Sequence, residues 1–123
     1  MFEEYDIVAA PGVDKKFAEK VFNILKALKK ELGLKTTSKM IISNRKDITG
    51  LYIPDKNIIL ISEFGIKSYA EQEKLPIYHS ILLNVLIHEI YHSILKGGDE
   101  ETVTNLTDKA VEIFIEKYLG IIN

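Results

Sequence analysis

Two histidines and a glutamate stand at helical spacing in an otherwise apolar part of the chain. Residues 88–92 read His-Glu-Ile-Tyr-His, and most other side chains between positions 81 and 95 are aliphatic. On a helix, residues four positions apart lie one turn apart on the same face, with their Cβ atoms about 6 Å from each other. His88 and His92 can therefore converge on one metal ion, and tetrahedral zinc suits such ligands.

The glutamate between the two histidines points to the side of the ligand face. Glu89 is predicted not to bind the metal but to act as a general base, taking a proton from a water molecule that the ion activates. Burying two imidazoles and a carboxylate in an apolar helix without a partner would cost several kcal/mol, so a partner is expected. The alternative interpretation is a buried helix whose histidines are satisfied by other hydrogen bonds.

A third protein ligand decides the class of site, because a catalytic zinc keeps three protein ligands and one open position. His79 is the only other histidine, and it lies about 13.5 Å along the helix axis from His88. Cysteine is absent, so the third ligand must be a carboxylate. Gly97 and Gly98 predict a helix end and a reversal, and Asp99 is a suitable N-cap for the next helix.

This arrangement puts Glu100 and Glu101 in the first turn of a helix that folds back on the first one. The apolar positions of that second helix are Val103, Leu106, Ala110, Val111, Ile113 and Phe114. Their mean direction lies about 80° from Glu100 and nearly opposite to Glu101. Glu100 is therefore the favoured third ligand and Glu101 the alternative. Either carboxylate can instead simply complement the helix dipole.

At this point the chain resembles the gluzincins, zinc metallopeptidases in which a His-Glu-x-x-His motif is followed by a glutamate on a downstream helix. Its small size makes it most similar to the minigluzincins, which are minimal archaeal-type members. The resemblance covers residues 39–111 by motif and is specific only at the zinc motif. It implies that His88, His92 and Glu100 bind Zn²⁺ and that Glu89 is the general base.

The elements that must position these residues follow from the hydrophobic pattern. The pattern predicts helices over residues 14–32, 76–95 and 99–119, strands over 39–43, 50–53 and 57–62, a short helix or loop over 64–74, and a tail over 120–123. Pro54, Asp55 and Lys56 are the predicted turn of a hairpin. We therefore expect one α+β, zincin-like domain over residues 1–123, with a three-stranded sheet, an N-terminal helix, a zinc-motif helix and a C-terminal glutamate helix.

Zincins are expected to hold the substrate backbone along a strand at the rim of the cleft. The candidate residues for this strand are Asn57, Ile58, Ile59, Leu60 and Ile61, because an open strand edge recognises extended peptide through main-chain hydrogen bonds. The alternative is that this strand is central and that Ile41 and Ile42 form the edge. The two arrangements are equally compatible with the sequence.

The predicted activity is zinc-assisted hydrolysis of peptide bonds, with Tyr91 and Tyr118 as candidate donors to the oxyanion. Tyr91 can equally point into the core. Two other readings stay open. The first is a zinc-binding sensor or interaction module without catalysis. The second is a latent, zymogen-like peptidase in which the hydrophobic tail 119–123 or the N-terminal segment blocks the cleft of its own or a neighbouring molecule.

Composition limits the partners. The net charge is −2, which gives no reason to expect nucleic acid or an anionic membrane surface as a partner.

The cellular location is predicted from two features of the sequence. The start of the chain is acidic and does not resemble a signal peptide, and the polar residues of the 76–95 helix argue against a membrane span, so a cytoplasmic location is predicted. Abundant Lys, Glu and Ile without Cys is typical of thermophiles, although an AT-rich genome gives the same bias.

Overall fold

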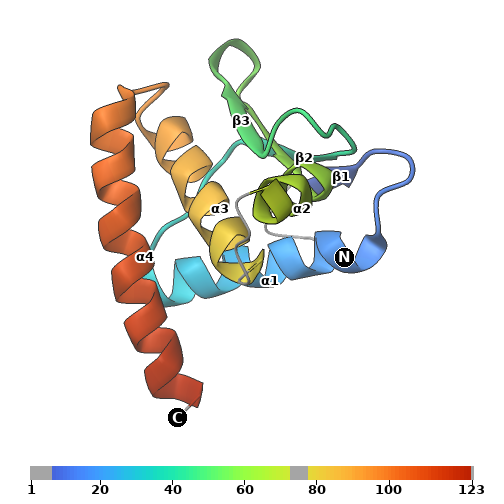
Figure 1. Cartoon of the computed structure of the whole chain (residues 1–123). Coiled ribbons are helices and arrows are strands. Elements are labelled where there is room, and N and C mark those ends of the chain that lie inside the picture. Colours follow the sequence, from blue (N-terminus) through green and yellow to red (C-terminus); the bar gives the residue numbers. More distant parts are fainter. Residues whose placement is uncertain (1–6, 73–77, 123) are drawn as a thin grey trace.

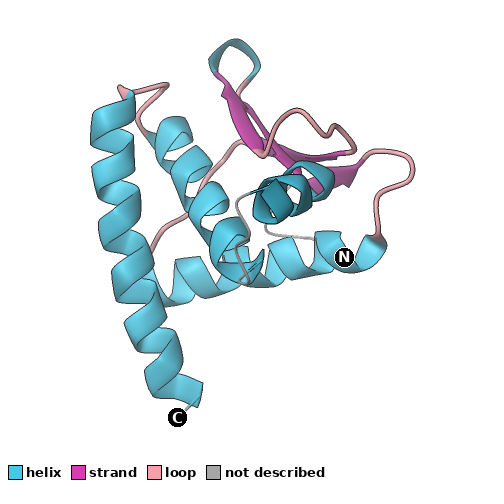
Figure 2. Cartoon of the chain, in the orientation of Figure 1, coloured by secondary structure: helices cyan, strands magenta, loops and turns pink. Residues whose placement is uncertain are grey.

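The computed structural model describes residues 7–72 and 78–122, without the side chains of residues 70, 72, 78–80 and 117–122. The described part of the chain consists of four helices and a small sheet that lies to one side of them (Figures 1 and 2), which confirms the α+β class. In chain order the elements are β1 (Ile7–Ala9), α1 (Lys15–Leu32), β2 (Lys39–Ser43), β3 (Gly50–Ile53), the 3₁₀ turn η1 (Pro54–Lys56), β4 (Ile58–Ser62), α2 (Glu63–Gln72), α3 (Tyr78–Ile94) and α4 (Glu100–Ile122).

The first helix begins and ends where its capping residues predict. The carboxylate of Asp14 accepts a hydrogen bond from the backbone N–H of Lys16 at 2.9 Å, and Gly33 ends the helix in the left-handed conformation with φ 65°. One face of α1 is buried through Phe17, Ala18, Val21, Leu25 and Leu28. The lysines lie mostly on the opposite face, in agreement with the amphipathic pattern.

The sheet has four strands in the order β1-β2-β4-β3, one more than predicted. β1, β2 and β4 are parallel, and β3 is antiparallel to β4, so the predicted 50–62 hairpin is confirmed. The additional strand β1 covers only three residues beside Pro11 and Gly12. So short a run cannot display the alternation by which a strand is recognised, and it pairs with β2 only in the folded chain.

The position of β4 overturns the expected substrate strand. β4 lies between β2 and β3, so residues 57–61 do not form an open edge. The alternative is confirmed in placing this strand centrally but wrong about the edge, because β2, with Ile41 and Ile42, lies between β1 and β4. The physical reason is that Ile59 and Ile61 are fully buried and the run Ile-Ile-Leu-Ile is apolar on both faces, as an interior strand requires. The free edge on this side of the sheet belongs to β3.

The helix that carries the histidine motif packs between the sheet and the last helix. α3 contacts β3 and β4 on one side, and α4 runs along its other side (Figure 1). Leu82, Leu86 and Ile90 repeat every fourth residue on α3 and are fully buried. No helix in residues 7–72 and 78–122 combines the length and apolarity that a membrane span needs.

The turn between α3 and α4 is built from residues with positive φ. Lys96, Gly97 and Gly98 have φ values of 55°, 105° and 48°, which reverse the chain within a few residues. Asp99 then caps α4, since the backbone N–H and the hydroxyl of Thr102 both donate to its carboxylate at 2.8 Å. α4 continues to Ile122, so residues 120–122 are helical and not the predicted tail.

Candidate metal centre

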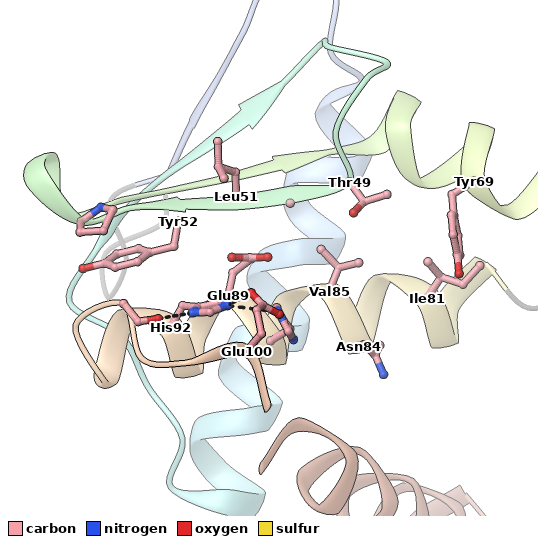
Figure 3. Close-up of a pocket in the computed structure, with 14 residues that line it drawn as sticks. Thr49, Leu51, Tyr52, Tyr69, Ile81, Asn84, Val85, Glu89, His92 and Glu100 are labelled. Carbon is pink, nitrogen blue, oxygen red and sulfur yellow. Dashed lines mark hydrogen bonds and ion pairs between the residues drawn. The ribbon is translucent and has the colours of Figure 1, made fainter. Parts of the chain in front are cut away.

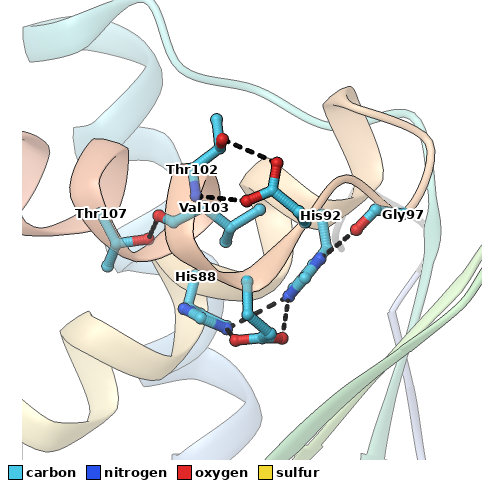
Figure 4. A network of polar contacts seen from close by, with 8 residues as sticks. His88, His92, Gly97, Thr102, Val103 and Thr107 are labelled. Atoms are coloured by element: carbon cyan, nitrogen blue, oxygen red, sulfur yellow. Dashed lines mark hydrogen bonds and ion pairs between the residues drawn. The ribbon is translucent and has the colours of Figure 1, made fainter.

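Three predicted ligands meet between α3 and α4. Nε2 of His88 and Nε2 of His92 lie 3.2 Å apart (Figure 4). Oε2 of Glu100 lies 3.2 Å from the Nε2 of His88, and Oε1 of Glu100 lies 2.7 Å from that of His92. One ligand atom of each residue lies within 4.8 Å of the others. The cluster joins residues from two helices at the point where the chain reverses.

The donor set and its spacing fit a zinc ion. Two nitrogen ligands at zinc distances on a tetrahedral ion lie about 3.3 Å from each other. The 3.2 Å between the two imidazole nitrogens matches this spacing. The side chains of His88 and His92 are 21% and 12% exposed, and that of Glu100 is 74% exposed, so the cluster is open to solvent on the glutamate side. An open position beside three protein ligands is what a catalytic site needs.

The imidazole of His92 is held by the turn that follows α3. Its Nδ1 lies within hydrogen-bond distance of the backbone carbonyl of Gly97 (Figure 4). A carbonyl oxygen can only accept, so Nδ1 carries the proton and donates it. In the neutral imidazole, Nε2 is then the nitrogen without a proton, and it faces Glu100; this is the tautomer that a metal ligand requires. Sequence reasoning identified Gly97 only as a helix end and missed this contact.

The two adjacent glutamates have different surroundings. The Asp99 cap fixes the first turn of α4, and this turn brings Glu100 to the two histidines. Glu101 is exposed and does not belong to the cluster. The helical direction used to rank the two carboxylates therefore agrees with their observed positions.

Glu89 lies beside the cluster in a different electrostatic environment. Only 7% of the residue is exposed, although its side chain lines the same cavity as the three cluster residues. Burial raises the pKa of Glu89 from its ordinary value of 4.5 to about 7, while the charge of His92 acts in the opposite direction and that of Glu100 adds to the increase. A carboxyl group with such a pKa can both accept and release a proton near neutral pH.

The cavity itself extends beyond the cluster and has a volume of about 860 Å³. The edge strand β3 covers one side of it, and α2 and α3 form the other walls (Figure 3). Its lining residues are Thr49, Gly50, Leu51, Tyr52, Pro54, Tyr69, Ile81, Asn84, Val85, His88, Glu89, His92, Gly97 and Glu100. Sequence reasoning missed Gly50, Tyr52 and Tyr69, because no local pattern marks residues that reach the cavity from β3 and α2.

The predicted tyrosine donors are placed differently. Tyr91 packs against the hydrophobic core and is not among the residues that line the cavity in the described part of the chain. The side chains of Tyr118 and His79 lie outside the described residues. The predicted blocking of the cleft by residues 119–123 or by the N-terminal segment stays a prediction. Residues 1–6 and 123, and the side chains of residues 119–122, lie outside the described part of the chain. The structure instead brings the aromatic rings of Tyr52 and Tyr69 to the cavity.

Comparison with known proteins gives a likeness of fold. The structure is similar to the crystal structure of a Wss1 mutant from Saccharomyces cerevisiae, with a TM-score of 0.60 over 94% of each chain. The two sequences are 13% identical, so this likeness concerns the fold alone. No protein-family model and no curated protein matches the sequence. Together, the shared fold and the His-His-Glu cluster fit a metallopeptidase-like fold, and membership of the minigluzincins stays a prediction.

Proposed function

We propose that this protein is a zinc-dependent metallopeptidase that hydrolyses internal peptide bonds. The observation that carries the proposal is the meeting of two kinds of group in one cavity. A His-His-Glu cluster with zinc-like spacing lies beside the buried carboxyl group of Glu89. A metal site without catalytic function has no need of such a carboxyl group, since burying it costs stability.

His88, His92 and Glu100 would hold the ion, and zinc would supply Lewis acidity toward a carbonyl group and a water molecule when bound. The remaining chemistry belongs to Glu89. Its carboxylate takes a proton from the attacking water and then passes the proton to the leaving amine. Burial raises the pKa of this carboxyl group in the metal-free chain, and a bound cation would lower it again, which favours the carboxylate that accepts the proton.

The substrate class follows from the walls of the cavity. β3 is the edge strand of the sheet and lines the cavity through Gly50, Leu51 and Tyr52. An extended peptide can add to such an edge through main-chain hydrogen bonds. No lysine or arginine is among the described lining residues, so the described cavity offers no cation to bind a free C-terminal carboxylate. Cleavage within a chain, next to apolar side chains, is the activity that these walls favour.

The test combines metal content with hydrolysis. Zinc-loaded wild-type protein is expected to hold about one zinc per chain and to cleave a quenched fluorescent peptide library. Glu89→Gln should keep the zinc and lose at least about a hundredfold in turnover, because the proton acceptor is gone. Glu100→Gln should lose zinc, while Glu101→Gln, the neighbouring matched control, should keep both zinc and activity.

Two results would contradict the proposal in different ways. Wild-type protein that takes up no zinc would mean that the cluster is held only by hydrogen bonds between its own side chains. Protein that holds zinc but cleaves no peptide, also after either terminus is trimmed, would instead favour the non-catalytic zinc-binding module. Activity that appears only after trimming would identify the latent form.

A further inference from the structure

A network of hydrogen-bonded polar side chains adjoins the His88, His92 and Glu100 cluster at Ser93. Thr36, Ser38 and Ser93 are 8%, 3% and 7% exposed, and Ser93 follows His92 on α3. The hydroxyl oxygen of Ser93 lies 2.7 Å from that of Thr36 and 2.6 Å from that of Ser38. The Ser38 hydroxyl in turn donates to the side-chain oxygen of Asn57 at 2.6 Å. These contacts join parts of the chain that are distant in sequence.

Only one assignment of donors and acceptors gives every hydrogen bond in this network a proton. The amide oxygen of Asn57 can only accept, so Ser38 gives it its single hydroxyl proton. The contact between Ser38 and Ser93 must then use the proton of Ser93, and the contact between Thr36 and Ser93 must use the proton of Thr36. The backbone N–H of Ser38 donates to the Thr36 oxygen at 3.1 Å. In the reverse order, the oxygens of Ser38 and Ser93 would face each other without a proton.

The network reaches the cavity at its other end. The hydroxyl of Tyr52, a cavity-lining residue of β3, donates to the same oxygen of Asn57 at 3.2 Å. Asn57 stands between η1 and β4 with φ 52°, and its carbonyl accepts from the backbone N–H of Lys39 at the start of β2. The contacts therefore connect the last turn of α3, the start of β2 and the wall that β3 forms over the cavity.

We propose that Thr36, Ser38 and Ser93 are positioning residues for the metal centre, an inference that rests on the proposed function. They fix the last turn of α3 against the sheet, so that His92 keeps a constant place relative to the wall formed by Tyr52. Three residues with positive φ follow this turn, so no further helical residues hold it from the C-terminal side. A buried network that is fully satisfied favours one arrangement, since breaking one bond leaves a desolvated polar group.

A purely structural role for the network predicts a different result from a positioning role. Loss of a buried hydroxyl lowers the free energy of unfolding in either case. Provided that the variant still folds, a structural role leaves the zinc affinity of the folded protein unchanged. A positioning role lowers that affinity, because a network coupled to a binding site changes binding by about 2- to 30-fold without touching the bound group. Zinc affinity therefore separates the two roles and does not depend on any peptidase assay.

The experiment compares Thr36→Val with Thr107→Val in the full chain. Both threonines are buried and both hydroxyls are bonded, but Thr107 donates only to the Val103 carbonyl within α4, at 2.7 Å. The zinc dissociation constant is measured by competition with a chelator, and urea unfolding of the zinc-free protein shows that each variant folds. Ser93→Ala tests the other partner of the same bond, and Thr36→Ser restores the hydroxyl.

The expected result is a zinc dissociation constant raised about tenfold in Thr36→Val and Ser93→Ala, and changed less than about twofold in Thr36→Ser and Thr107→Val. Equal zinc affinity in all variants and the wild type would overturn the positioning role while leaving the proposed metal site intact. An equal loss in Thr107→Val would overturn it too, since the loss would then reflect general destabilisation. A wild type that binds no zinc would overturn the proposed function, and the positioning role with it.

Discussion

Gly50 of β3 lies directly against Glu89 of α3. A Cβ atom at position 50 would stand 3.1 Å from Cγ of Glu89, 3.3 Å from its Oε2 and 2.6 Å from Cγ1 of Val85. The absence of a side chain therefore lets the first residue of the edge strand pack onto the helix that carries the histidines. This contact covers the carboxyl group and contributes to the burial that raises the pKa of Glu89.

A methyl group at position 50 is the first change we predict to be harmful. Gly50→Ala should lower the free energy of unfolding by about 1–3 kcal/mol, because the new Cβ overlaps Cγ1 of Val85, a β-branched side chain with few rotamers. Turnover should fall more than the affinity for peptide, since the displaced atoms include those of Glu89. Urea unfolding and steady-state hydrolysis measure the two effects.

The paired substitution Val85→Ala provides the control for this prediction. It removes the atom that would lie 2.6 Å from the new Cβ. In Gly50→Ala/Val85→Ala the loss of stability should therefore be smaller than the sum of the two single losses. Strictly additive losses would show that position 50 does not contact α3 in this way.

Glu89 predicts an unusual dependence of stability on pH in the zinc-free protein. Its pKa is about 7 in the folded chain and near 4.5 when unfolded, so the folded state binds the proton more tightly. The stability that this group contributes is fully present below pH 4.5 and is lost as the pH rises through 7. Glu89→Gln removes the cost of ionisation and should be more stable than the wild type at pH 8 by roughly 1–3 kcal/mol.

Urea unfolding in the presence of a chelator measures this difference at pH 8 and at pH 4. The advantage of Glu89→Gln should disappear at pH 4, where the wild-type carboxyl group is protonated in both states. Glu101→Gln changes an exposed carboxylate on α4 and should show no such dependence on pH. An advantage of the same size at both pH values would mean that Glu89 does not titrate with a raised pKa.

Local patterns predicted the elements of this fold much better than the order of the strands. The helix that carries His88 and His92 followed from apolar spacing, and the reversal after it followed from Gly97 and Gly98. Glu100 was preferred to Glu101 because a helix has a fixed angle per residue, and that angle is a local property. Each of these features depends on residues that are close in sequence.

The strand order and the cavity wall depend instead on contacts between distant residues. No local sequence pattern around Ile7 predicts its pairing with Met40. This pairing makes β2 an interior strand. The sequence left the place of β4 open between edge and centre for the same reason, although a continuous apolar run is typical of a strand buried on both faces. Tyr52 and Tyr69 reach the cavity from separate elements, and only the assembled fold brings them together.

The carbonyl of Gly97 leads to a prediction about zinc affinity. Gly97 has φ 105° and accepts the Nδ1 proton of His92, so Gly97→Ala should move this carbonyl by straining the turn. Zinc affinity should fall by about tenfold, as for other losses behind a metal ligand. Gly12→Ala is the matched control, because Gly12 also has a positive φ, 86°, and open space around its Cβ position. Both variants should lose similar stability, but only Gly97→Ala should lose affinity in a chelator competition.

The wall that α2 contributes to the cavity predicts a preference for peptides with large apolar side chains. Tyr69 is 44% exposed and lies beside Ile81 at the end of the cavity away from His92 (Figure 3). Tyr69→Ala removes roughly 1 kcal/mol of apolar contact with a bound side chain, which corresponds to an increase in KM of about fivefold. The zinc content should stay unchanged, because Tyr69 is no part of the metal cluster.

The measurement compares peptides that differ only in one residue next to the cleaved bond, for example leucine against alanine. Tyr69→Ala should raise KM for the leucine peptide and change KM little for the alanine peptide, since only the larger side chain reaches the ring. Ile113→Ala serves as the control, because Ile113 is an equally exposed apolar residue of α4 outside the cavity. If both peptides lose affinity equally, Tyr69 acts on the peptide backbone or on α2 itself, and the proposed apolar contact is absent.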